Sequence, residues 1–147
     1  METAVTAEFA DGEYRFWLPL PQMTALERAC GDVSILTLEE RMRAAIGQDG
    51  ETFVFVGGGS AMVADIRETI RLALIGGDHG MVDGESVEVG PIRAKQLVDE
   101  YVCPARPMGE GLVLAWRILH ALVFGVRLKK KADEPGADGA SPSGKAS

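Results

Sequence analysis

The chain has 147 residues, of which 46% are hydrophobic, and this is the length and apolar content of one compact domain. It carries 15 Lys and Arg residues against 22 Asp and Glu residues, for a formal net charge of −7. This acidic balance argues against binding to a nucleic-acid backbone, because basic residues cluster only at positions 129–131. The longest apolar stretch, 111–126, is interrupted by Arg117 and His120 and is too short to span a membrane.

The N-terminal residues 4–19 are predicted to form a β-hairpin. Asp11 and Gly12 form a pair that is typical of two-residue hairpin turns with positive φ angles. A turn at these residues places Phe9 opposite Tyr14 and gives the hairpin one apolar face. That face consists of Val5, Ala7, Phe9, Tyr14, Phe16 and Leu18. Because an isolated hairpin is marginally stable in water, we expect this face to pack on helices.

Apolar residues recur at helical spacing in five later segments. The predicted helices are 21–30, 37–46, 61–75, 91–102 and 109–128. Thr37 and Glu40 have the spacing of a capping box at the start of the second helix. Gly76 and Gly77 close the third helix, and Pro91 suits the first turn of the fourth.

The segments between the helices are harder to interpret. Residues 52–56 have the composition of a strand, so we expect a short strand or an extended loop, and residues 78–90 are predicted to be a loop. The predicted fold is therefore mainly α with an N-terminal β-hairpin (α+β), in a single globular domain over residues 1–131. Residues 132–147 are small or polar, and we expect a disordered tail.

The pattern of residues that could carry chemistry is sparse, and we expect a protein that is not an enzyme. Cys30 and Cys103 have no CxxC spacing, and no signal peptide precedes them, so we expect reduced thiols in a cytoplasmic protein. His79 and His120 have no Cys or carboxylate at ligand spacing, so no metal is predicted. No catalytic residue and no cofactor are predicted either.

One local feature resembles part of an enzyme site. A strand-like run leads into a glycine-rich segment, Gly57 to Ser60, ahead of a helix, and this arrangement can hold phosphate groups at the helix N-terminus. The segment lacks the Lys-Ser/Thr of a P-loop and the spacing of a dinucleotide-binding motif. A flexible turn is therefore the preferred interpretation, and a small phosphate-binding enzyme is an alternative.

The fifth predicted helix is apolar on nearly every side. Its broad apolar face consists of Leu112, Ala115, Trp116, Leu119, Leu122, Val123 and Val126. A second, narrower face consists of Leu114, Ile118, Ala121 and Gly125. A helix of this kind is either buried within its own domain or covered by another chain. We predict that the broad face is core and that the narrower face binds a partner or a second copy.

The order of four segments resembles the gene transfer agent family of tail proteins. They are a short helix with Leu26 and Glu27 that ends at Cys30 and Gly31, and the stretches 70–77, 94–101 and 115–125. The resemblance covers about residues 4–126; the long 78–90 loop and the C-terminal extension depart from it. That family is grouped with the tail assembly chaperones of tailed phages and is also labelled a tail tube protein family.

The resemblance implies a function in particle assembly in the cytoplasm of the bacterial host. A tail assembly chaperone coats the tape measure protein, keeps it soluble and recruits tail tube subunits around it. The sequence therefore predicts a non-enzymatic chaperone whose partners are the tape measure protein and the tail tube protein. The main alternative is a structural tail tube or connector subunit, which needs enough strand to close a ring. A helix-turn-helix regulator is disfavoured by the acidic charge, and a homo-oligomer is left open.

Overall fold

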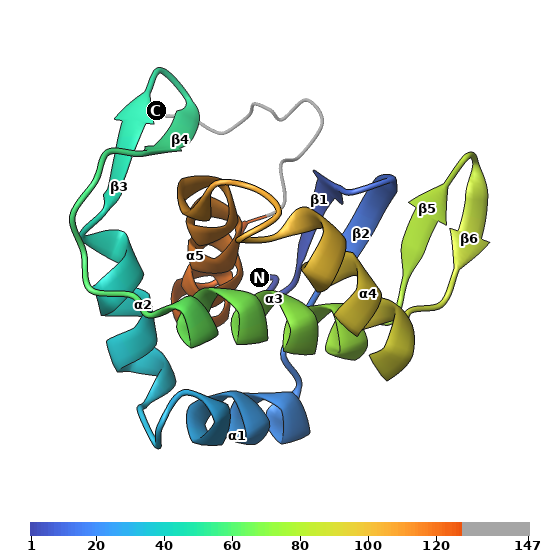
Figure 1. Cartoon of the computed structure of the whole chain (residues 1–147), viewed down its shortest axis with the longest axis horizontal. Coiled ribbons are helices and arrows are strands. Elements are labelled where there is room, and N and C mark those ends of the chain that lie inside the picture. Colours follow the sequence, from blue (N-terminus) through green and yellow to red (C-terminus); the bar gives the residue numbers. More distant parts are fainter. Residues whose placement is uncertain (128–147) are drawn as a thin grey trace, which may run out of the picture.

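The computed structural model describes residues 1–127 of the chain. The predicted disordered tail at 132–147, the basic run at 129–131 and the predicted last residue of the fifth helix lie outside these residues. Within the described part, five helices and six strands follow one another (Figure 1). They are β1 (Val5–Phe9), β2 (Gly12–Phe16), α1 (Leu20–Ala29), α2 (Ile35–Arg43), β3 (Ile46–Asp49), β4 (Thr52–Phe55), α3 (Val63–Gly77), β5 (Gly80–Val82), β6 (Glu85–Val87), α4 (Pro91–Tyr101) and α5 (Met108–Phe124).

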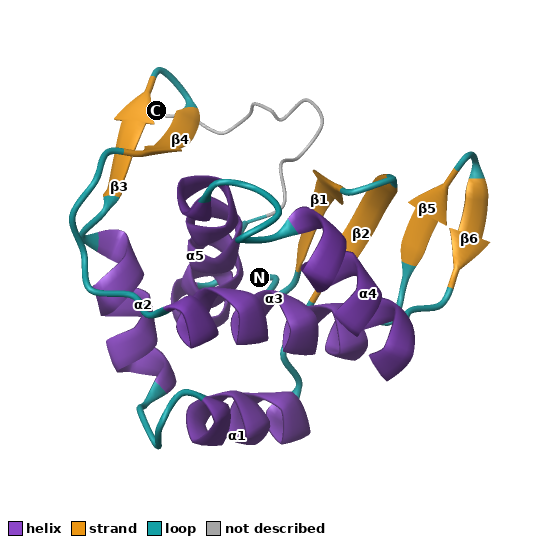
Figure 2. Ribbon diagram, in the orientation of Figure 1, coloured by secondary structure: helices purple, strands orange, loops and turns teal. Residues whose placement is uncertain are grey.

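The predicted fold class, mainly α with a single hairpin, is wrong. The described strands form two antiparallel sheets, one with the order β1-β2-β5-β6 and one that contains only β3 and β4. Figure 2 shows the two sheets on separate sides of the helices. The protein is an α+β protein, and the predicted N-terminal hairpin is confirmed as β1 and β2.

The N-terminal hairpin has a different register from the predicted one. Phe9 lies opposite Gly12, so the turn consists of Ala10 and Asp11 and does not include Gly12. The pairing is displaced by two positions from the one in which Phe9 faces Tyr14. Because side chains alternate along a strand with a period of two, this displacement leaves the same residues on the buried face. The buried members are Val5, Ala7, Tyr14, Phe16 and Leu18.

Contacts of Asp11 and Gly12 with residues outside the turn account for this register. The carboxylate of Asp11 accepts hydrogen bonds from the hydroxyl of Tyr14 and, at 2.7 Å, from the guanidinium of Arg93 in α4. Gly12 faces β5, where a Cβ atom would overlap the carbonyl oxygen of Met81. The glycine is therefore required by the close approach of β5, and not by a positive φ angle.

The helix α2 begins before its predicted start because a different residue caps it. The hydroxyl of Ser34 accepts a hydrogen bond from the backbone N–H of Thr37 at 3.1 Å, as an N-cap residue does. The predicted capping box at Thr37 and Glu40 therefore lies inside the helix. The helix also ends early, and Ile46 is left to pair with Phe55 in the hairpin of β3 and β4.

The hairpin of β5 and β6 replaces the loop predicted at residues 78–90. Its turn residues Asp83 and Gly84 have φ angles of 53° and 80°, as a two-residue hairpin turn requires. Each of its strands has 3 residues. Such a strand is too short for the alternation of apolar and polar residues to be recognised in the sequence.

The helix α3 lies against β2 of the N-terminal hairpin and forms the centre of the core. Ile66, Ile70 and Leu74 are fully buried. At the end of the helix, a Cβ atom on Gly76 would overlap the carbonyl oxygen of Trp17, and one on Gly77 would overlap that of Arg15. These glycines were predicted to close the helix, but they lie within it, and the left-handed cap that follows is Asp78.

The packing of β5 against Gly12 generates a stability prediction. Gly12→Ala should lower the free energy of unfolding by about 1–3 kcal/mol, because the new methyl group overlaps backbone that must move. Gly90→Ala is the matched control, since a Cβ atom there meets nothing within 4 Å. Chemical denaturation of both variants checks the difference, and equal stabilities would contradict the close approach of β5.

Candidate functional site

The helix α5 is covered by α2, α3 and β4 and approaches β1. Four residues of its broad face are buried in the core, namely Leu112, Ala115, Trp116 and Leu119. Leu122 and Val123 are half-buried, and Val126 lies beyond the helix and is exposed. The narrower face is divided. Ile118 is 2% exposed and Ala121 is 0% exposed, so both of these residues belong to the core and are inaccessible to a partner.

The other two residues of the narrower face lie in different surroundings. Leu114 is half-buried and lines a surface cavity. Gly125 follows the end of the helix, where a Cβ atom would overlap the side chain of Met1. The structure therefore does not bring Leu114, Ile118, Ala121 and Gly125 together as one accessible surface. The helical period places residues on a common face but does not report which neighbours cover that face.

A buried carboxylate joins α5 to α2. Glu39 is 1% exposed and accepts a hydrogen bond from the indole N–H of Trp116 at 3.1 Å. Its oxygens also accept hydrogen bonds from the guanidinium of Arg43, the shortest at 2.7 Å. These charge-assisted bonds compensate the burial of the charge. The adjacent Glu40 is exposed, so the two neighbouring carboxylates lie in opposite surroundings.

The ring of His120 extends this cluster along α5. It stacks between the rings of Trp116 and Phe124, with centroid distances of 4.7 and 4.8 Å. The Nδ1 atom of His120 lies 3.8 Å from an oxygen of Glu39 and has no hydrogen-bond partner among the described residues. His120 therefore borders both the buried carboxylate and the surface.

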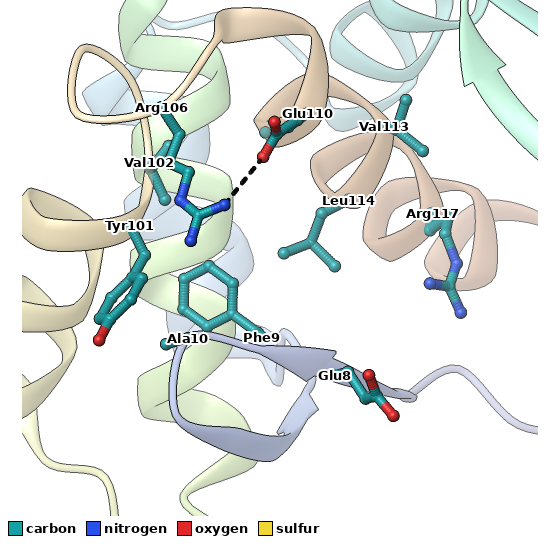
Figure 3. A pocket seen from close by; sticks show the side chains of 11 residues that line it. Glu8, Phe9, Ala10, Tyr101, Val102, Arg106, Glu110, Val113, Leu114 and Arg117 are labelled. Atoms are coloured by element: carbon teal, nitrogen blue, oxygen red, sulfur yellow. Dashed lines mark ion pairs between the residues drawn. The ribbon is translucent and has the colours of Figure 1, made fainter.

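Two surface cavities lie between β1 and α5, and both are bordered by Arg117. We refer to them together as the β1–α5 groove. The first has a volume of about 420 Å³. Figure 3 shows Phe9 and Leu114 pointing toward one another across it, from β1 and α5. At its rim Arg106 lies 6.0 Å from the ring centroid of Tyr101 and 3.7 Å from Glu110.

The second cavity has a volume of about 720 Å³ and lies at the other end of the groove. Most charged residues that line it are basic, and they come from separate elements. The lining includes Arg15 of β2, Arg117 of α5, Arg127 beyond α5, His120 and one carboxylate, that of Glu2. Three arginines against one carboxylate give this end of the groove an excess of positive charge, which favours an acidic group.

The strand at the wall of the groove is the edge of the four-stranded sheet. Thr6 and Glu8 of β1 are exposed. The outer side of an edge strand presents backbone N–H and C=O groups that can pair with another chain. An edge strand beside an elongated groove is the arrangement to which an extended segment adds as a further strand.

The glycine-rich segment does not lead to a free helix N-terminus. The first turn of α3 contains Asp65, which is 1% exposed and accepts hydrogen bonds from the backbone N–H of Met62 at 2.8 Å and from Arg41 at 3.1 Å. A carboxylate therefore lies beside this helix N-terminus, where a phosphate would compete with it. This arrangement argues against the phosphate-binding alternative at Gly57 to Ser60.

The cysteines are both free thiols. Cys103 is buried, and Cys30 lies beside α3 with the backbone oxygen of Ala64 3.9 Å from its sulfur. Burial, followed by the nearby Asp65, raises the pKa of Cys30 to about 12. The thiol is therefore protonated at neutral pH, and a protonated thiol is a poor nucleophile.

Over residues 1–127, the side chains form no group of three or more His, Cys, Asp and Glu that could hold a metal ion. In the same residues, no helix has both the length and the hydropathy needed to cross a bilayer.

The comparison with protein families gives a match over almost the whole described chain. Residues 2–125 match the family described as "Phage tail tube protein, GTA-gp10". The chain belongs to this family. No curated protein and no solved structure matches the chain. Membership of the GTA-gp10 family confirms the predicted relation to phage and gene transfer agent tails, and it leaves the chaperone function as a proposal.

The buried carboxylate generates a second prediction. Glu39→Gln should lower the free energy of unfolding by about 1.5–3 kcal/mol, because the charge-assisted hydrogen bonds are lost or weakened. Glu40→Gln is the matched control, since Glu40 is exposed and its substitution should change stability by less than about 0.5 kcal/mol. Thermal melts followed by circular dichroism compare the two variants. Equal melting temperatures would show that Glu39 is not part of the α2–α5 contact.

The divided face of α5 generates a third prediction. Ile118→Ser should lower the free energy of unfolding by about 2–5 kcal/mol, because it opens a cavity in the core and buries a hydroxyl group. Leu114→Ser, four residues earlier on the same face, should have a clearly smaller effect because its side chain is half-buried. Urea denaturation measures both. A larger loss for Leu114→Ser would mean that the groove is closed in solution.

Proposed function

We propose that this member of the GTA-gp10 family is a structural subunit of the tail tube and acts by binding other tail proteins. The observation that carries the proposal is the match of residues 2–125 to a family whose description names the tail tube. A tube repeats one contact between successive subunits, so each subunit needs two different surfaces. The β1–α5 groove beside one sheet edge and the free edge of β6 at the other are candidates for these surfaces.

A tail assembly chaperone is the second candidate, and the size of the sheet favours it. The longest strands of the four-stranded sheet have 5 residues, and β5 and β6 have 3 each. Strands of 3–5 residues lie in the lower half of the usual range of about 3–10, so this sheet offers little strand for closing a tube wall. In this role the protein would bind the tape measure protein and the tail tube protein during assembly and then leave, and the groove would receive an extended segment of one of them.

Both candidates share further features that we propose together. The protein acts without catalysis and without a cofactor, through contacts between folded surfaces. Assembly takes place in the cytoplasm of the bacterial host, where tail proteins are synthesised and joined. The two candidates differ in whether the protein stays in the finished particle.

Mass spectrometry of purified particles distinguishes the two candidates, which gives a fourth prediction. A tube subunit should be present in purified tails in many copies, at an abundance comparable to that of the other structural tail proteins. A pull-down from producing cells is carried out beside it. Absence from particles together with co-purification of the tape measure protein would replace the tube proposal with the chaperone.

A further inference from the structure

The hairpin of β5 and β6 is an exposed acidic projection. Asp83, Glu85 and Glu88 are all exposed, and residues 80–90 contain no Lys or Arg. Figure 1 shows this hairpin at one end of the molecule, away from α2 and from the sheet of β3 and β4. None of the three carboxylates forms an ion pair with another described residue. The hairpin therefore presents uncompensated negative charge.

The second cavity of the β1–α5 groove presents the opposite charge. Arg117 and Arg127 are exposed, and within residues 1–127 neither forms an ion pair. The guanidinium of Arg15 lies 5.0 Å from the ring centroid of Trp17, with no carboxylate of the described chain in ion-pair distance. The acidic hairpin and the basic cavity lie at opposite edges of the same sheet, so they cannot neutralise each other within one molecule.

The directions of the strands allow the two edges to meet in a second copy. Each neighbouring pair in the order β1-β2-β5-β6 is antiparallel, so β6 runs opposite to β1. A second copy in the same orientation, with its β6 placed beside β1 of the first, therefore continues the antiparallel alternation. The same placement brings its acidic hairpin to the β1–α5 groove.

We propose that the acidic hairpin of one copy docks into the β1–α5 groove of the next. In this contact β6 adds to the edge of β1, and Glu85 and Glu88 face the arginines that line the second cavity. The inference rests on the proposed function as a tube subunit, because it identifies the contact that repeats. Each added copy leaves one groove and one hairpin free, so the contact is head-to-tail and generates a ring or a helical filament.

Sedimentation velocity of the full chain tests the docking and gives the fifth prediction. The wild-type protein should form oligomers that grow with concentration at low salt. In 1 M NaCl it should shift toward the monomer, because the screening length falls from about 10 Å at 0.1 M to about 3 Å. A wild-type protein that stays monomeric at low salt up to millimolar concentration would overturn the proposal.

Charge reversal identifies the two surfaces. The hairpin variant Glu85→Lys with Glu88→Lys places positive charge against the basic groove, and the groove variant Arg117→Glu places negative charge against the acidic hairpin. Each variant alone should sediment as a monomer. An equimolar mixture should recover the oligomers, because each variant then meets a surface of opposite charge on the other. Retained oligomers in either variant alone, or a mixture that stays monomeric, would overturn the proposal.

Matched reversals elsewhere control for the change in net charge. Asp49→Lys with Glu51→Lys reverses two exposed charges on the hairpin of β3 and β4, and Arg28→Glu reverses an exposed charge on α1. Both controls should associate like the wild type, and monomeric controls would overturn the assignment of the two surfaces. Circular dichroism melts of all variants check folding, and recovery in the mixture requires that both are folded.

The outcomes separate this inference from the tube proposal. Association of the purified chain together with its absence from particles would leave the docking standing and remove the tube function. Presence in particles together with a monomeric wild-type protein would retain the tube function and overturn the docking.

Discussion

The fold depends on the need to cover α5 on nearly every side. The helix has 17 residues, and only Glu110, Arg117 and His120 among them are Asp, Glu, Lys, Arg or His. The helices α2 and α3 and the strand β4 cover much of it, and the polar edge of Trp116 is satisfied by Glu39. The side toward β1 is covered incompletely, and this remaining gap is the β1–α5 groove. The candidate site is thus a consequence of how a small domain encloses a helix that is too apolar to be left in water.

The sequence predicted local features well where a period extends over many residues. The five helices and the N-terminal hairpin follow from apolar residues at intervals that only one regular structure places on a common face. The hairpin register could not be predicted, because it depends on Arg93 and on the approach of β5 to Gly12, which are distant in the chain. The turn at Asp83 and Gly84 has the same residue pair as the one used to predict the first hairpin. It was not recognised because its strands are too short to show a period.

The candidate site could be predicted only in part, for a similar reason. Leu114 was identified from the helical projection, and it does line the groove. The projection also selected Ile118, whose burial depends on how far the neighbouring elements extend along the helix. The basic end of the groove comes from Arg15, Arg117 and Arg127, which are spread over three segments, so no local pattern connects them. Only the tertiary fold gathers these charges and separates them from the acidic hairpin.

The pair of glycines at the end of α3 has a consequence for the evolution of the family. Side chains at Gly76 and Gly77 would meet main-chain carbonyl oxygens, which no substitution at a neighbouring residue can make smaller. A larger residue would therefore have to move the whole helix away from the hairpin, and every core contact of α3 would change at once. Even alanine, the smallest substitution, would meet this overlap, so neutral drift cannot replace these two glycines stepwise. Homologues should keep the glycine pair even where the charged residues on their surfaces have diverged with their partners.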